Sequence, residues 1–146
     1  MAISETISIH LTCMFMRCAP KDIDVCARTI ALLGADQPEI IHASLSWVIK
    51  NRLNSAAEGH HAMPDLASIC RDMLREATGL QQSGLEGANL SNTEWCRIYA
   101  VNCLVWAGDL EDETNGATSC HRHDTTRRWA RKRTPTALLG PFIFYR

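Results

Sequence analysis

The sequence predicts a mainly α-helical domain with a small β element. Four segments up to Gly108 carry apolar residues at helical spacing and have capping or stop signals at their ends. After Gly108 the helical pattern stops, turn-forming residues become dense, and the final segment is apolar and aromatic. A length of 146 residues with 46% hydrophobic residues suits one soluble globular core. We therefore expect about four helices and short terminal strands in one domain.

An N-terminal arm over residues 1–24 precedes this domain, which occupies residues 25–146. Apolar residues alternate with other residues in its first half and favour an edge strand or coil that ends at Pro20: Ile3, Ile7, Ile9 and Leu11. Glu5 and the lack of a basic first segment make a cleaved signal peptide a poor interpretation. We expect the arm to be retained.

The first two helices follow closely on each other. The first begins after Asp22 or Asp24 and ends at Gly34, a residue suited to a left-handed cap. The second spans about residues 38–53, because Asp36 offers a capping carboxylate and Pro38 suits a first helical turn. A polar loop is expected over residues 54–64.

Two more helices and a region of turns complete the domain. The third helix follows Asp65, and residues 78–91 are predicted to be a loop. A capping box from Ser91 to Glu94 opens the fourth helix, which Gly108 ends. Residues 109–126 are rich in turn formers, and residues 134–146 end in a segment typical of a short strand.

Charge is segregated along the chain. The formal net charge is −1, but residues 127–146 carry six basic and no acidic residues, which leaves −7 for residues 1–126. This distribution excludes a globally cationic nucleic-acid binder, and one basic strip on an otherwise acidic domain favours a docking contact with an acidic partner over nonspecific duplex binding. No apolar run approaches the roughly 18 residues of a membrane span.

Seven cysteines are many for a chain of this length: Cys13, Cys18, Cys26, Cys70, Cys96, Cys103 and Cys120. Buried reduced thiols are one interpretation, and disulfides, within or between chains, are its main rival. Zinc is a third, since three potential ligands stand in Cys120-His121-x-His123, but there is no CxxC pair. We expect no metal and no cofactor.

The densest polar cluster is Asp112-x-Thr114-x-Gly116-Ala117-x-x-Cys120-His121. Thr, Asn and Gly in such a run commonly build a tight turn, because their side chains bond neighbouring backbone groups. The alternative is a loop that presents Asp112 and His121 to a cleft, since binding groups concentrate on loops.

Several ordered motifs resemble the SleB-type (spore-cortex-lytic, CwlJ-like) cell wall hydrolase family. Ala27-Arg28-Thr29-Ile30, Pro38 and the helix end Val48-Ile49-Lys50-Asn51-Arg52 are similar to its A-R-x-I-x-x-E, G-E-P and V-V-x-N-R segments. The run DETNGATSCHRH followed by Trp129-Ala130 is similar to its D-P-T-x-G-A-x-x-Y-H…W-A motif. Trp95, Ala100, Gly108 and Asp112 match a further segment, and Gly140 to Tyr145 resemble its ending.

The resemblance implies a lysozyme-like α+β fold and cleavage of peptidoglycan glycan strands. Such cleavage requires a carboxylic acid that protonates the leaving oxygen. The family's catalytic glutamate falls on Leu33, its second acid on Gln37, and its C-terminal histidine on Phe142. Asn51, Asp112, Thr114 and His121 are remnants of the catalytic region, and Arg52, Gly116 and Trp129 match substrate-contacting positions.

These departures predict a degenerate domain, kept for its shape as a structural or cell-wall-engaging part of a larger particle such as a bacteriophage tail or baseplate. Other protein subunits and peptidoglycan are the expected partners, and nucleic acid is not. We expect the chain in a virion or otherwise outside the cytoplasm. The alternatives are an active glycan-cleaving enzyme with a relocated acid, for which Asp36 and Glu39 are candidates, and a cytosolic binding module with reduced thiols.

Overall fold

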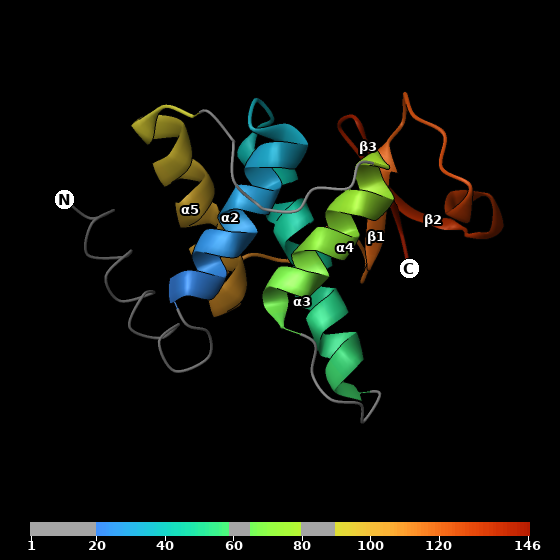
Figure 1. Ribbon diagram of the computed structural model, residues 1–146, viewed down its shortest axis with the longest axis horizontal. Coiled ribbons are helices and arrows are strands. Elements are labelled where there is room, and N and C mark those ends of the chain that lie inside the picture. The colour runs from blue at the N-terminus through green and yellow to red at the C-terminus, as the bar shows by residue number, and fades with distance from the viewer. Residues whose placement is uncertain (1–19, 59–64, 80–89) are drawn as a thin grey trace.

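Four helices lie against one another, and a three-stranded sheet stands at one end of them (Figure 1). The computed structural model describes residues 20–58, 65–79 and 90–146. Residues 1–19 of the predicted arm (1–24), with Cys13 and Cys18, lie outside the described residues, and residues 20–24 belong to the first helix. Within them the predicted fold class, mainly α with a small β element, is confirmed.

The first two helices are longer than predicted. Helix α2 spans Pro20–Gly34, and α3 spans Glu39–Glu58 rather than ending near residue 53. The extension contains Ala56, Ala57 and Glu58, which are good helix formers. The prediction that Asp36 caps α3 is wrong, because its carboxylate accepts a hydrogen bond from the Gln37 side-chain amide at 3.4 Å instead.

The fourth helix begins and ends at the predicted signals, whereas the third begins at the predicted cap and ends where a loop was predicted over residues 78–91. Helix α4 spans Leu66–Thr78, where the Asp65 carboxylate accepts the Ser68 N–H at 2.8 Å. Helix α5 spans Asn92–Ala107 and opens with the reciprocal Ser91–Glu94 capping box. Both helices end at a left-handed glycine, Gly79 with φ 75° and Gly108 with φ 82°.

The sheet consists entirely of residues that follow the helices. Its strands are β1 (Ser119–Arg122), β2 (Pro135–Leu139) and β3 (Phe142–Tyr145), in the antiparallel order β1-β3-β2. The final segment, predicted as one strand, is therefore a hairpin of two strands, because the chain reverses at Gly140, whose φ is 53°. A short 3₁₀ helix, η1 (Trp129–Lys132), precedes the hairpin and was not predicted.

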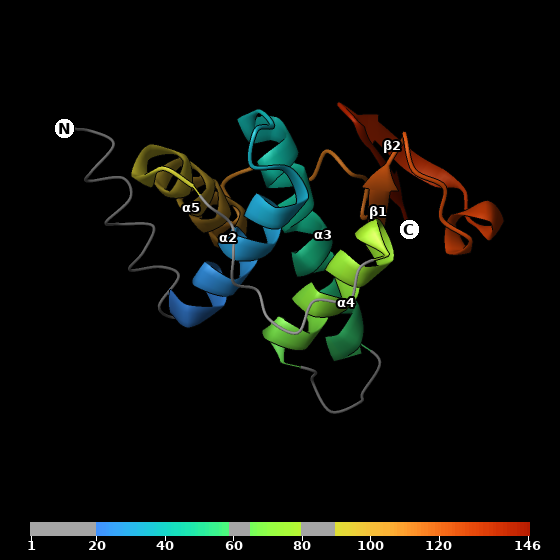
Figure 2. The same ribbon diagram turned by 45° about the horizontal axis from the view of Figure 1, so that its top comes forward.

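One apolar core joins the helices to the sheet. Helix α2 lies in the middle and packs on α3, α4 and α5, while β1 packs on α3 and α4 (Figure 2). Phe142 and Phe144 of the central strand are buried together with Ile30, Ile49 and Ile98 from three helices. The inner face of the sheet therefore completes the core that the helices begin.

His42 is the one histidine on a described helix, and it is fully buried in α3. Its Nε2 lies 2.8 Å from the carbonyl oxygen of Gly34, so Nε2 donates to the end of α2. Its Nδ1 has no hydrogen-bond partner. Burial is the main cause that lowers the pKa of His42, because water cannot solvate the protonated ring inside the core.

We predict that His42 makes unfolding depend on pH. The unfolded state binds a proton below the ordinary histidine pKa of about 6.5, whereas the folded state resists it, so stability falls as pH drops from about 7 to about 5. In urea unfolding, His42→Gln, which keeps an N–H donor, should flatten this dependence. The same change at the exposed His123 should not, and equal slopes in both variants would contradict the prediction.

Candidate functional site

The residues selected from the sequence gather where the helices meet the sheet, and Asp112 organises the first group. Its Oδ1 accepts the N–H of Thr114 at 2.9 Å and also the Thr114 hydroxyl. Its Oδ2 accepts the N–H of Gly116 at 3.0 Å and the Asn51 side-chain amide at 2.9 Å. Both oxygens of this half-buried carboxylate thus accept hydrogen bonds from its own loop or from α3.

These contacts set the charge state of Asp112. Burial acts to raise its pKa, but the hydrogen bonds from Thr114, Asn51 and Gly116 outweigh burial and lower it below the ordinary value. Asp112 is therefore held as an ionised acceptor at neutral pH. A group in that state cannot act as a general acid.

The rest of the loop is a tight turn tied to the sheet. Asn115 and Gly116 are both left-handed, with φ of 57° and 80°. Asn115 donates to the carbonyl of Thr136 at 3.0 Å, and the Thr136 hydroxyl donates to the carbonyl of Thr114 at 2.8 Å. Of the two interpretations of this cluster, the tight turn is correct for Thr114 and Gly116. The Thr114 hydroxyl accepts the N–H of Ala117, and the N–H of Gly116 donates to Asp112.

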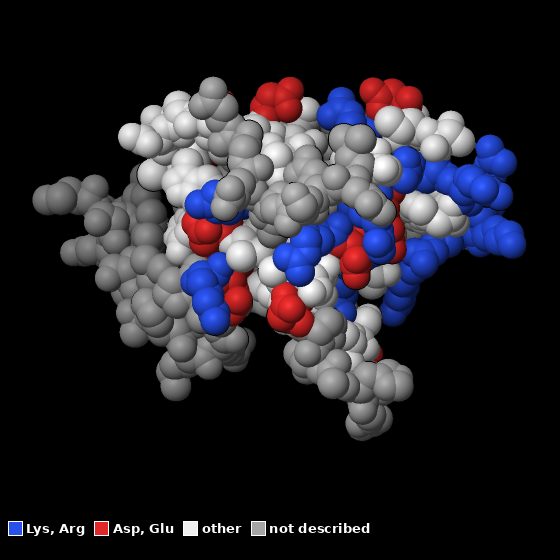
Figure 3. Space-filling model, viewed as in Figure 1, with Lys and Arg blue, Asp and Glu red and all other residues white. Residues whose placement is uncertain are grey.

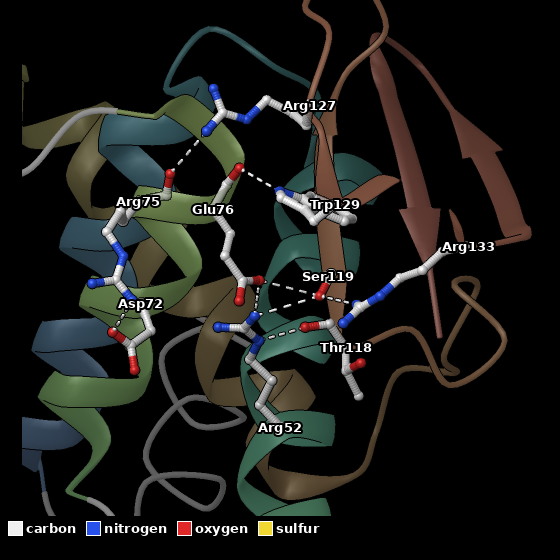
Figure 4. Close-up of polar contacts among 9 residues, drawn as sticks. All are labelled: Arg52, Asp72, Arg75, Glu76, Thr118, Ser119, Arg127, Trp129 and Arg133. Atoms are coloured by element: carbon white, nitrogen blue, oxygen red, sulfur yellow. Dashed lines mark hydrogen bonds and ion pairs between the residues drawn. The ribbon is translucent and has the colours of Figure 1, made fainter. Parts of the chain in front are cut away.

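Arg52 organises the second group (Figure 4). From α3 its guanidinium reaches the carbonyl of Thr118, the carboxylate of Glu76 on α4 and, at 3.4 Å, the hydroxyl of Ser119. Ser119 in turn donates to Glu76 at 3.2 Å. The substrate-contacting position suggested for Arg52 is thus occupied by an internal ion pair.

Trp129 fixes η1 against the same corner. Its Nε1 donates to the backbone carbonyl of Glu76 at 3.0 Å, and its ring meets His121 and Tyr145 edge-on, with centroids 5.6 and 5.2 Å apart. Arg133 lies over the Trp129 ring at 5.4 Å and donates to Ser119 at 2.8 Å (Figure 4). Trp129 is therefore a packing anchor rather than an open platform.

His121 does not face a cleft, so that expectation is wrong. It lies in β1, is 4% exposed, and stacks on Tyr145 with ring centroids 5.4 Å apart. Its Nδ1 donates to the carbonyl of Arg122 at 2.7 Å, and its Nε2 lies 2.9 Å from the Tyr145 hydroxyl. Burial raises the pKa of Tyr145, which keeps the phenol protonated. Both ring nitrogens of His121 are engaged inside the protein.

A pocket of about 140 Å³ opens beside Leu33, at the end of α2. Leu33 is 7% exposed, and the part of the chain that the structure describes contributes no carboxylate to the pocket lining: Leu33, Ala77, Thr78, Arg122, Thr125 and Phe142. Typical ligand pockets measure roughly 300–1,000 Å³, so this one is small for a glycan strand. Arg122 lies over the Phe142 ring at 5.7 Å and forms an ion pair with Asp124 at 3.5 Å.

Gln37 lies beside the same pocket. A methyl group on Gly34 would meet Gln37 Cγ at 2.8 Å and Phe142 Cε2 at 3.7 Å, so these side chains close over Gly34. Phe142 is therefore a neighbour of Leu33 and Gln37, although it is distant from both in sequence. The alternative acids Asp36 and Glu39 are exposed and do not line the pocket.

The five described cysteines are free thiols, and four are buried: Cys26, Cys70, Cys103 and Cys120, with Cys96 exposed. The hydrogen bond with Cys26 lowers the pKa of Cys70, whereas burial raises the pKa of Cys103 to about 11 and of Cys120 to about 12. Across residues 20–58, 65–79 and 90–146, no group of three or more His, Cys, Asp or Glu side chains could hold a metal ion.

Sequence reasoning missed four residues of this corner: Glu76, Ser119, Arg133 and Tyr145. Glu76 occupies a polar position of an amphipathic helix, which predicts a solvated side chain. Only the pairing of Ser119 with Tyr145 across β1 and β3, a long-range feature, brings the group together. Tyr145 was part of the aromatic ending, but nothing in that pattern indicated a hydrogen bond to His121.

No family model matches this chain, and comparisons with curated proteins and with solved structures found no match. Along the described part of the chain, no helix is long and apolar enough to cross a membrane.

We predict that Asp112→Asn destabilises the protein by about 2 kcal/mol at pH 7, because hydrogen bonds to a half-buried charged acceptor are weakened. The lowered pKa makes this contribution present above the unfolded value of about 3.9 and lost as pH falls through the folded value. In urea unfolding, the difference from the native chain should therefore shrink towards about pH 3.

The neighbouring Glu113→Gln is the matched control, because Glu113 is exposed. It should change the unfolding free energy by less than about 0.5 kcal/mol. Equal effects of the two substitutions would show that Asp112 has no special role in the loop.

Proposed function

We propose that this chain is a catalytically degenerate peptidoglycan-hydrolase-like domain. It serves as a structural or cell-wall-engaging part of a larger particle, such as a phage tail, and does not cut glycan strands. The observation that carries the proposal is the pocket beside Leu33, whose lining among the described residues includes no carboxylate. The SleB-type resemblance supplies the comparison: its two acids and its histidine correspond to Leu33, Gln37 and Phe142.

The proximity of these three residues supports the proposal. Gln37 and Phe142 both pack towards Gly34, and Leu33 and Phe142 line one pocket. The fold brings Phe142, which is distant in sequence, beside Leu33 and Gln37, so three side chains without an acid or a base meet at one place. A leucine, an amide and a phenylalanine cannot protonate a leaving oxygen or activate water.

The remaining polar groups do not replace that chemistry. Asp112 is saturated with hydrogen bonds, and both nitrogens of His121 are engaged. Glu76 accepts hydrogen bonds from Arg52 and Ser119, so its carboxylate is engaged by partners inside the protein. These residues maintain the junction of helices and sheet, which is the role expected of a domain kept for its shape.

We predict that the native chain releases no reducing ends from purified peptidoglycan and gives no clearing in a zymogram. Leu33→Glu restores a carboxyl group to an apolar, nearly buried position beside Arg122, where activity should first become measurable. Leu33→Gln has nearly the same shape without the acid and is the matched control. Leu33→Glu combined with Phe142→His tests whether the histidine position adds to the effect.

Clearing by the native chain would contradict the proposal and favour the alternative of an active enzyme with a relocated acid. In that case Glu76→Gln tests one relocated acid, because the half-buried Glu76 carboxylate lies at the junction of α4 and β1, where it accepts from Arg52 and Ser119. Asp36→Asn and Glu39→Gln are the exposed comparisons.

A further inference from the structure

Basic side chains gather at the end of the molecule that carries the sheet (Figure 3). Four of them are exposed around η1: Arg128, Arg131, Lys132 and Arg133. We call these four residues the basic ridge. No acidic residue occurs between residues 127 and 146, so the sequence around the ridge offers no neutralising partner.

The ridge is built on a rigid support. Trp129, inside the short helix, is anchored to the end of α4 by its bond to the Glu76 carbonyl and by edge contacts with two rings. Arg127, which precedes the ridge, donates to the Arg75 carbonyl at 3.5 Å, and Arg133 at the other end donates to Ser119 at 2.8 Å (Figure 4). The contacts of Arg127, Trp129 and Arg133 thus hold the backbone of the ridge at three positions, which lowers the conformational entropy lost when a ligand binds.

The charges of the ridge are not compensated within the described residues. The ion pairs there involve Arg28, Arg52, Arg75 and Arg122, and no carboxylate lies within 4.0 Å of the ridge nitrogens. Neighbouring cations without counter-charges repel one another and concentrate anions from solution. An anionic ligand relieves that repulsion.

The surroundings of the ridge distinguish between anionic ligands. Single-stranded nucleic acids need exposed aromatic faces for stacking, but Trp129 is covered by Arg133 and Tyr145 is buried. Protein interfaces need an apolar or aromatic centre, whereas the exposed residues between 128 and 134 are Arg, Lys and Thr. A flexible polyanion without bases requires neither feature.

We propose that the basic ridge binds an anionic cell-wall polymer, a chain of polyol units joined by phosphodiesters. The proposal rests on the proposed function, which sets the domain against the cell wall. Guanidinium groups form paired hydrogen bonds with phosphate oxygens, and three of the four ridge residues are arginines. The ridge would therefore attach the particle to the wall, while the pocket beside Leu33 stays chemically inert.

The test measures binding of the full chain to immobilised poly(glycerol phosphate). Arg131→Glu with Lys132→Glu should weaken binding at least about tenfold, because two attractive contacts become repulsive. Lys21→Glu with Arg97→Glu changes the net charge equally at exposed positions of α2 and α5 and should stay within about twofold. Binding by the native chain should weaken steeply between about 50 mM and about 300 mM salt.

Several outcomes would overturn the inference. No binding to the polymer, equal losses in both double variants, tighter binding to DNA, or tighter binding to poly-glutamate would each do so. If the first double variant fails to fold, Arg131→Gln with Lys132→Gln replaces it.

The zymogram on the same preparations separates the two proposals. No polymer binding together with no clearing rejects the ridge and leaves the inert pocket standing. Clearing by the native chain rejects the proposed function whatever the polymer measurement gives.

Discussion

The junction between the helices and the sheet depends on one guanidinium group. Arg52 projects from α3 and contacts Glu76 on α4 together with Thr118 and Ser119 at the start of β1. A planar cation with five N–H donors can serve three elements at once, which a lysine ammonium could not do with the same geometry. Its side chain is only 15% exposed, so loss of the partner Glu76 would leave an uncompensated charge near the core. The residues of η1 and the basic ridge attach to the same group, because Trp129 donates to the Glu76 backbone carbonyl and Arg133 donates to Ser119.

The Asp112 loop is likewise organised by one charged side chain, here an anion instead of a cation. There a carboxylate collects donors from its own turn and from Asn51, and the turn is then tied to Thr136 of the sheet. In both groups the polar side chains satisfy backbone and ion-pair requirements. Polar residues at this junction therefore stabilise the fold.

Local signals predicted most of the helical part. The capping box at Ser91 and the left-handed glycines at Gly79 and Gly108 act within one turn of the chain, so the sequence contains their full cause. The site was less accessible, because its contacts join residues far apart in sequence. His121 lies inside the protein only because β1 pairs with β3 and brings Tyr145 beside it, and Glu76 becomes an ion-pair partner only when α4 packs near β1. Propensity and spacing contain no information on such pairings.

The order of strands in the sheet has a consequence for how the chain can assemble. The central strand, β3, is the last of the three in sequence, and β1 and β2 each pair with it rather than with each other. Until the segment from Phe142 to Tyr145 has been synthesised, β1 and β2 have no strand with which to pair. The contacts of His121 and Trp129 with Tyr145 can therefore form only after all three strands have been synthesised.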